Sequence, residues 1–363
     1  VLKGSRILLD EGNIDLRVLR TSARDVTCEI VVGGMLKEHK GINLPGAHID
    51  LPSLTTKDHR DLAWGLKLDV DYIALSFVKD ATDIEAAKRV IKAKGSHALV
   101  IAKIERPEAI VKIHGILEAA DGIMVARGDL AVELSASDVP VVQKLLIGKA
   151  NNTGKTVIVA TQMLESMIHS QIPTRAEASD VANAIFDGAD AVMLSAETAV
   201  GINPPNAVRV MSDIIHKAEA SAFAYHKPPA KIVDNDPRRT GDYVHALARA
   251  ATAACEESHA KAVVAFTLTG WSARIMAKYR PPVPIFGMTP DRKTLYQLSL
   301  QWGITPIMAP LMQTTDSMIL HGERLLMDQG HLTKGDIVIV MAGGTAKHKA
   351  SNMIKIHPLG AYS

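Results

Sequence analysis

The stretch that decides the fold is VIAKIERP, residues Val100–Pro107. Its apolar first half is typical of a strand that is buried on both faces, as the strands of parallel sheets are. Side chains alternate along a strand, so Lys103 and Glu105 are predicted to lie on the same side, at the strand's carboxyl end. Active sites of β/α barrels form at that end. These two charged residues are therefore the first candidates for catalysis.

The same pattern recurs on both sides of this stretch. Apolar runs alternate with amphipathic segments roughly every 23 to 35 residues, a spacing that suits parallel βα units. A small residue and an aspartate precede three of the runs, as in Ala120-Asp121 and Ala189-Asp190, which indicates a wound repeat. The predicted strands are Tyr72–Phe77, Leu99–Ile104, Gly122–Ala126, Val157–Thr161 and Ala191–Ser195. Between the last two, Thr174 and Glu177 predict a capped helix that ends near Gly188.

Four segments are predicted along the chain. Residues 1–46 alternate apolar and polar residues between turn formers, which indicates a small antiparallel β module. Residues 47–226 carry the βα units, and residues 227–242 concentrate proline, glycine and charge, as linkers do. Residues 243–363 again alternate helical and strand patterns, which indicates a separate doubly wound α/β domain. The fold class is therefore α/β, with a series of βα units between two smaller parts.

Composition excludes several classes of function. The 41 basic and 39 acidic residues nearly cancel, so neither nucleic acid nor a membrane surface is an expected partner. The two cysteines, Cys28 and Cys255, are far apart and fit a reducing cytoplasm better than a disulfide scaffold. No run approaches the roughly 18 apolar residues of a spanning helix.

Two further strand ends add chemistry to the first. Gly128 and Asp129 follow one predicted strand, and Thr161 ends the next. Two carboxylates, Glu105 and Asp129, suit magnesium, which takes its remaining ligands from water and substrate oxygens. A lysine beside them would stabilise a migrating phosphoryl group or an enolate. The competing interpretation makes Lys103 a rim lysine that only pairs with Glu105.

At these residues the sequence resembles the pyruvate kinases. The resemblance rests on the segments Gly41–Asp58 and Lys103–Glu105, on IMVARGDL at Ile123–Leu130, and on ATQMLES, PTRAEASD and AVMLSAETA between Ala160 and Ala199. It implies magnesium-dependent phosphoryl transfer from phosphoenolpyruvate to ADP, giving ATP and an enolate that is protonated to pyruvate in glycolysis. It also implies a (β/α)8 barrel, a β lid whose hinge contains Pro45, Asp50 and Pro52, and a C-terminal regulatory domain.

The resemblance also assigns roles to residues. Glu105 and Asp129 are similar to the metal ligands of the family, and Lys103 to the lysine that stabilises phosphoryl and enolate charge. The backbone amides of Gly128 and Asp129 would hold the substrate carboxylate, and Thr161 would act with water in protonating the enolate. Residues of a possible effector phosphate loop are Thr267, Thr269, Gly270 and Ser272, at a helix N-terminus where phosphate binds well.

Potassium, a homotetramer and a phosphorylated effector are further expectations from the family. The helix Thr174–Asp187, with Arg175 near its start, is the expected subunit contact. The turn Gly343–Ala346 leaves the identity of the effector open, and a plain helix cap is the competing interpretation of the loop.

The main departure from the family is a shortage of strands. A β/α barrel needs eight strands, whereas residues 48–225 supply five. The resemblance places the other three, with an arginine and the potassium ligands, before the β module, and we expect them upstream in the complete protein. Two alternatives stay open: a lyase that uses a metal enolate without ADP, and a non-catalytic subunit that binds partners through its last domain.

Overall fold

The computed structural model describes residues 1–10, 12–38, 40–46, 54–135, 137–222, 243–343 and 351–361. The chain divides into two compact units. The first contains Val1–Lys149, Val157–Asp187 and Val192–Ile215, and the second contains Ala150–Thr156, Gly188–Ala191 and His216–Ser363. The four segments predicted from the sequence stay a prediction, and the predicted linker, residues 227–242, lies outside the described residues.

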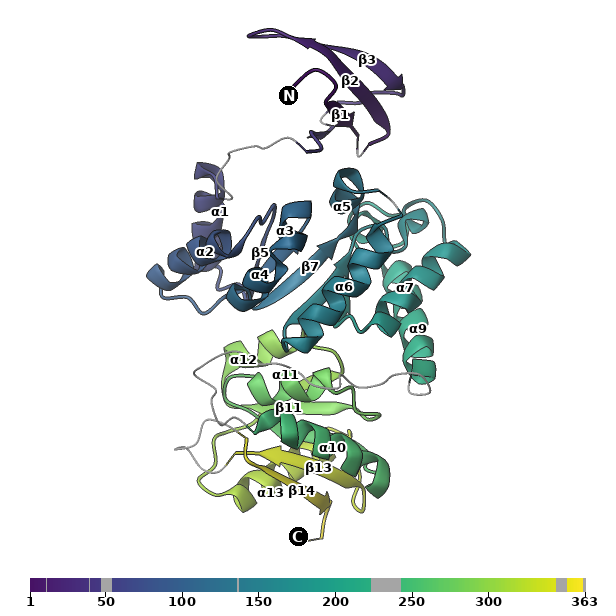
Figure 1. Ribbon diagram of the computed structural model, residues 1–363. Helices are drawn as coiled ribbons and strands as arrows, with labels where there is room; N and C mark the ends of the chain where they lie inside the picture. The colour runs from purple at the N-terminus through teal and green to yellow at the C-terminus, as the bar shows by residue number, and fades with distance from the viewer. Residues whose placement is uncertain are drawn as a thin grey trace. The chain divides into compact units, whose positions relative to one another are not determined.

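The first strands form the antiparallel module that the alternating pattern predicts. The sheet order is β3-β2-β1-β4, and every pair in it is antiparallel; Figure 1 labels β1, β2 and β3. Its strands are β1 (Arg6–Leu9), β2 (Ile14–Thr21), β3 (Val26–Val32) and β4 (Ile42–Asn43). Of the three expected hinge residues, Pro45 lies in a turn, and Asp50 and Pro52 lie outside the described residues.

Helices and strands alternate from residue 54 to residue 222, as the sequence predicts. The strands pair in chain order, β5-β6-β7-β8-β9, and the pairs β5–β6 and β6–β7 are parallel. The strands are β5 (Tyr72–Leu75), β6 (Leu99–Ile104), β7 (Gly122–Ala126), β8 (Thr156–Ala160) and β9 (Ala191–Val192). The helices are α1 (Thr56–Lys67), α2 (Ala81–Ala93), α3 (Pro107–Val111), α4 (Ile113–Ala119), α5 (Arg127–Glu133), α6 (Val139–Asn152), α7 (Arg175–Asp187), α8 (Ala196–Ala199) and α9 (Pro204–Ala222), with a 3₁₀ turn at Glu165–Ile168.

Two strands are shorter at their carboxyl ends than predicted. β5 ends at Leu75, two residues before the predicted end, because Phe77 adopts a left-handed backbone with φ of 53°, which a strand cannot contain. β9 ends at Val192 rather than Ser195, because Ser195, with φ of −119° and ψ of −97°, precedes helix α8. Both departures occur where a strand gives way to a loop at its carboxyl end.

The predicted cap of helix α7 is present. The Thr174 hydroxyl donates to Glu177 Oε2 at 2.9 Å, and the Glu177 amide donates to Thr174 Oγ1 at 3.2 Å. The reciprocal bonds satisfy backbone donors that the first helical turn otherwise leaves open. Val181 and Ile185 are buried on one face of this helix, and Gly188 follows its end with φ of 98°.

The aspartates that precede the repeated strands are structural. The Asp121 carboxylate accepts the Val100 amide at 2.8 Å and pairs with Lys88 at 2.9 Å. Within the second unit, Asp190 pairs with Lys278, and both side chains are buried. Burial lowers the pKa of Lys278 to about 8, against the raising effect of Asp190. The aspartates of the sequence repeat therefore have a structural role: they hold the loops before the strands through hydrogen bonds and ion pairs.

The last part of the chain is the doubly wound sheet that the sequence predicts. Its order is β12-β11-β10-β13-β14, with β14 antiparallel to β13. The strands are β10 (Ala262–Phe266), β11 (Ile285–Thr289), β12 (Ile304–Met308), β13 (Ile337–Ala342) and β14 (Met353–Pro358). The helices are α10 (Val244–Ser258), α11 (Trp271–Lys278), α12 (Arg292–Leu298) and α13 (Thr315–Asp328).

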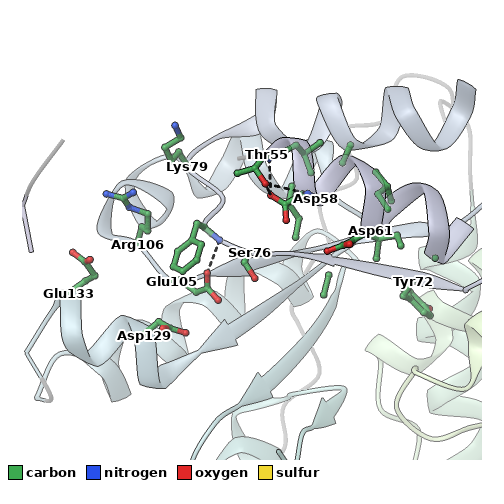
Figure 2. A pocket seen from close by; sticks show the side chains of 18 of the residues that line it. Thr55, Asp58, Asp61, Tyr72, Ser76, Lys79, Glu105, Arg106, Asp129 and Glu133 are labelled. Atoms are coloured by element: carbon green, nitrogen blue, oxygen red, sulfur yellow. Dashed lines mark hydrogen bonds between the residues drawn. The ribbon is translucent and has the colours of Figure 1, made fainter. Parts of the chain in front are cut away.

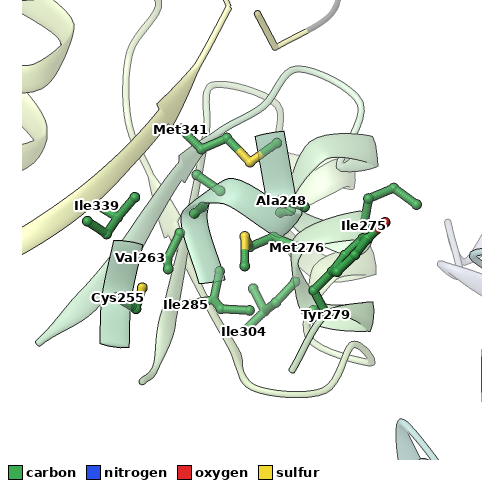
Figure 3. Packing of buried hydrophobic residues seen from close by; sticks show 14 of the residues in the cluster. Ala248, Cys255, Val263, Ile275, Met276, Tyr279, Ile285, Ile304, Ile339 and Met341 are labelled. Atoms are coloured by element: carbon green, nitrogen blue, oxygen red, sulfur yellow. The ribbon is translucent and has the colours of Figure 1, made fainter. Parts of the chain in front are cut away.

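Alternation along β10 builds a core on each face of this sheet. Val263 and Ala265 join one cluster of buried side chains (Figure 3), which includes residues of α10 and α11. Ala262 and Val264 join the other cluster, which includes residues of α13. Helices therefore cover both faces, as a doubly wound fold requires. Within the described residues, no helix has both the length and the apolar composition that crossing a membrane takes.

Candidate active site

The first two candidate residues form an ion pair at the end of β6. Lys103 Nζ lies 2.6 Å from Glu105 Oε1, and the two side chains are 25% and 1% exposed. Lys103 Nζ also donates to Ser76 Oγ at 3.0 Å. The prediction that both side chains lie on one side of the strand is confirmed. Because a buried carboxylate must be compensated, the contact with Lys103 offsets the cost of burying the Glu105 side chain at this position.

The second carboxylate oxygen of Glu105 has a backbone partner. The Phe77 amide donates to Glu105 Oε2 at 2.6 Å, shown by the dashed line at Glu105 in Figure 2. Phe77 follows strand β5, so the carboxylate is held by its own strand's lysine and by the neighbouring strand's loop. Two partners on two oxygens restrict rotation of the carboxylate, which orients it for any ligand that approaches.

Glu105 and Asp129 line the same cavity, whose volume is about 860 Å³. Asp129 comes from the first turn of α5, which begins directly after β7. Figure 2 shows the two carboxylates on neighbouring segments of this cavity, with Arg106 and Glu133 further along its wall. Burial raises the pKa of Glu133 above the usual value. Further carboxylates of the lining come from Asp58 and Asp61, and its cations are Lys79 and Arg106.

The donor set fits a hard divalent cation. Among the described residues, no group of three or more histidine, cysteine, aspartate or glutamate side chains could hold a metal ion. A zinc site of structural type needs such a group. Magnesium instead uses one or two carboxylates and completes its shell with water and substrate oxygens. Glu105 and Asp129 supply two carboxylates to one cavity, and carboxylate oxygen is the donor type that magnesium uses.

Gly128 and Thr161 contact one another directly. The Gly128 amide donates to Thr161 Oγ1 at 2.8 Å, and the Thr161 hydroxyl donates to the Ala160 carbonyl at 2.5 Å. A Cβ atom on Gly128 would lie 3.6 Å from the Thr161 side chain, an ordinary contact distance. The Gly128 amide, which was expected to hold the substrate carboxylate, therefore already has Thr161 as its partner. A substrate carboxylate that used the Gly128 amide would have to replace the threonine hydroxyl.

The loop that carries Thr161 has an unusual backbone. Thr161 and Gln162 both have positive φ, at 73° and 55°, which costs of order 1 kcal/mol or more for each non-glycine residue. Arg127 holds this loop through its guanidinium, which donates to the Thr161 carbonyl at 2.6 Å and to both carboxylate oxygens of Asp180 at 2.7 and 2.6 Å. Nothing in the sequence spacing indicated this contact, because 53 residues separate Arg127 from Asp180.

Replacing Arg127 with methionine is expected to reduce the free energy of unfolding by about 1.5–3 kcal/mol, the typical worth of hydrogen bonds that involve a charged group. The strained Thr161 loop loses its anchor in the same variant. Chemical denaturation monitored by circular dichroism measures the change. The control is Arg209→Met, because Arg209 is exposed and should cost no more than about 0.5 kcal/mol. Equal losses in the two variants would contradict the anchoring role of Arg127.

The predicted effector loop is only partly open to solvent. Thr267 and Ser272 are buried, and the Ser272 hydroxyl accepts a hydrogen bond from Ser351 at 2.8 Å. Gly270 precedes helix α11 with φ of 77°, and Thr269 is exposed. In the turn Gly343–Ala346, residues 344–346 lie outside the described residues. Ser272 thus contributes to packing in this structure, and the phosphate role of the loop stays a prediction.

Comparison with known proteins identifies the family of this chain. The family model for the pyruvate kinase barrel domain matches residues 1–208, and the model for the pyruvate kinase alpha/beta domain matches residues 245–357. The chain belongs to the pyruvate kinase family. The fold class, the family and the class of phosphotransferase predicted from the sequence are thereby confirmed. Pyruvate kinases require a metal ion and act on phosphoenolpyruvate and ADP.

Individual relatives agree with the family match. The chain is 43% identical to pyruvate kinases of Corynebacterium glutamicum and Mycobacterium tuberculosis, over 98% of this chain and 74% of each relative. It is 42% identical to a pyruvate kinase of Staphylococcus aureus, over 98% of this chain and 61% of that relative. The chain thus spans about three quarters of the length of the first two relatives.

Proposed function

We propose that the residues at the ends of β6 and β7, where Glu105 and Asp129 line one cavity, transfer a phosphoryl group from phosphoenolpyruvate to ADP, giving pyruvate and ATP. The observation that carries the proposal is the pair of carboxylates, Glu105 and Asp129, that line one cavity. An ammonium group lies 2.6 Å from one of them. Phosphoryl transfer depends on positioning and on compensation of charge, and these groups supply both.

The residues divide the work by charge. Glu105 and Asp129 would hold magnesium, which supplies Lewis-acid stabilisation of phosphoryl and enolate oxygens when bound. The Lys103 ammonium would stabilise the negative charge that develops as the P–O bond of phosphoenolpyruvate breaks and ADP oxygen bonds to phosphorus. The carbon product of that step is the enolate of pyruvate. One proton must then reach its methylene carbon for pyruvate to leave.

Substrate orientation and protonation fall to the next loop. The amides of Gly128 and Asp129 would bind the substrate carboxylate, with the Gly128 amide exchanging its bond to Thr161 for one to the substrate. The Thr161 hydroxyl, once released, would relay a proton from water to the enolate carbon. The closeness of Gly128 and Thr161, at 2.8 Å, supports this exchange, because a short movement of one hydroxyl suffices.

Finer properties are proposed on the support of family membership. These are a requirement for potassium in addition to magnesium, a homotetramer with Thr174–Asp187 at one subunit contact, and a cytoplasmic location. A phosphorylated effector is proposed at Thr267, Thr269, Gly270 and Ser272. The backbone of the α11 N-terminus supports that site, while the bond between Ser351 and Ser272 requires the serine to turn outward when phosphate binds.

A coupled assay for pyruvate tests the proposed reaction. Pyruvate should form from phosphoenolpyruvate only when both ADP and magnesium are present, and ATP should appear in equal amount. The assay is run on the complete protein with and without each component. Pyruvate production that did not depend on ADP would support the metal-enolate lyase instead, and would contradict phosphoryl transfer.

A further inference from the structure

Phe77 occupies a backbone conformation that its residue type does not favour. Its φ is 53°, and a non-glycine residue in the left-handed region carries a conformational cost. Glycine or asparagine would be the ordinary choice at such a position. The phenyl ring gains little from burial, since the residue is 54% exposed. The conformation therefore calls for an explanation other than packing of the ring.

The explanation lies in where the amide points. In this conformation the Phe77 amide donates to Glu105 Oε2 at 2.6 Å. Glu105 Oε1 is already engaged by Lys103 at 2.6 Å, and Lys103 is itself held by Ser76 Oγ at 3.0 Å. The two residues Ser76 and Phe77 therefore fix both partners of the ion pair, one through a side chain and the other through the backbone.

We propose that Phe77 is a positioning residue whose left-handed backbone aims its amide at Glu105 and so orients that carboxylate for a divalent cation. The inference rests on the proposed function, in which Glu105 is a metal ligand. With Oε1 held by Lys103 and Oε2 by the Phe77 amide, the carboxylate cannot rotate freely, and its remaining lone pairs keep one direction in the cavity that Glu105 shares with Asp129. Groups that orient a metal ligand in this way typically contribute 10- to 100-fold to metal affinity.

Two substitutions distinguish a role of the Phe77 backbone amide from a role of its phenyl ring. Glycine adopts a φ of 53° without strain, so Phe77→Gly should keep the amide in place although the ring is lost. Valine is β-branched and disfavours this region strongly, so Phe77→Val should move the amide away from Glu105. Both variants therefore remove the phenyl ring, but only Phe77→Val disfavours the left-handed backbone that places the amide.

The test measures binding of manganese, as a paramagnetic probe of the magnesium site, to the complete protein without substrate. Phe77→Val should raise the dissociation constant for manganese by about 10- to 100-fold. The dissociation constant of Phe77→Gly should stay within about threefold of that of the unchanged protein. The matched control is Asp69→Val. Asp69 also has a left-handed backbone, with φ of 54°, and it is exposed. It should lose thermal stability with unchanged metal affinity.

Three results would overturn the inference. Wild-type affinity in Phe77→Val would show that the amide does not orient the ligand, and weak binding by Phe77→Gly would assign the effect to the ring. Equal weakening in Asp69→Val would assign it to general strain. Should Phe77→Val fail to fold in a thermal melt, Phe77→Ala, which is strained less, should give an intermediate loss. Glu105→Gln tests the proposed metal site separately from the role of Phe77. Unchanged manganese binding in that variant would refute the metal site itself.

Discussion

Replacing Lys103 with methionine is expected to lower kcat by about 10²- to 10³-fold. The ammonium lies 2.6 Å from Glu105 and comes from the same strand end, so it is placed to act where negative charge develops during transfer. Removing one preorganised electrostatic group of this kind costs about 3–4 kcal/mol of transition-state stabilisation. Steady-state kinetics at saturating magnesium, phosphoenolpyruvate and ADP measure the loss.

The same substitution should have a second effect that depends on the metal. Without Lys103, the buried Glu105 carboxylate loses its cationic partner, which costs about 3–5 kcal/mol when no other cation is bound. Magnesium that binds the native state should restore part of that stability. The control is Lys112→Met, since Lys112 pairs with Asp80 at an exposed position. Near-normal kcat in Lys103→Met would contradict a catalytic role of the lysine and would mean that it only pairs with Glu105.

Replacing Glu105 with glutamine is expected to lower turnover roughly 10³-fold at ordinary magnesium concentration. The amide keeps the size of the side chain and removes the negative charge, and loss of a Lewis acid withdraws several kcal/mol of charge stabilisation. Activity should return in part as magnesium is raised. A titration of initial rate against magnesium concentration measures both effects.

Glu133→Gln provides the matched control for this prediction. Glu133 lines the same cavity, and burial raises the pKa of its carboxyl. We do not assign it to the metal, so its magnesium requirement should change less than threefold. Equal shifts in the two variants would mean that the overall charge of the cavity, rather than one ligand, sets the metal requirement.

Much of the site followed from strand periodicity alone. Lys103 and Glu105 are two residues apart at the end of an apolar run, and alternation places such residues on one side. Asp129 follows the next apolar run, and adjacent parallel strands bring their carboxyl ends to one edge. The capping box of Thr174 and Glu177 was equally local. In each case the deciding contact lies within a few residues or between neighbouring strands.

The rest of the site depends on contacts that spacing does not encode. The sequence placed Phe77 inside a strand, and only its φ of 53° reveals an amide turned toward Glu105. Arg127 and Asp180 pair across 53 residues. Ser272, predicted to face a phosphate, bonds instead to Ser351, which is 79 residues away. Backbone conformation and long-range pairing are tertiary properties, so a local pattern could not predict them.

Binding of manganese to the unchanged protein, to Glu105→Gln, to Asp129→Asn and to the double variant is the most direct test of the shared metal site. Electron paramagnetic resonance of free manganese gives the number of sites and their dissociation constants. We expect one tight site in the unchanged protein, with affinity that falls strongly in each single variant and little further in the double variant. Wild-type affinity in either single variant, or two sites lost independently, would contradict it.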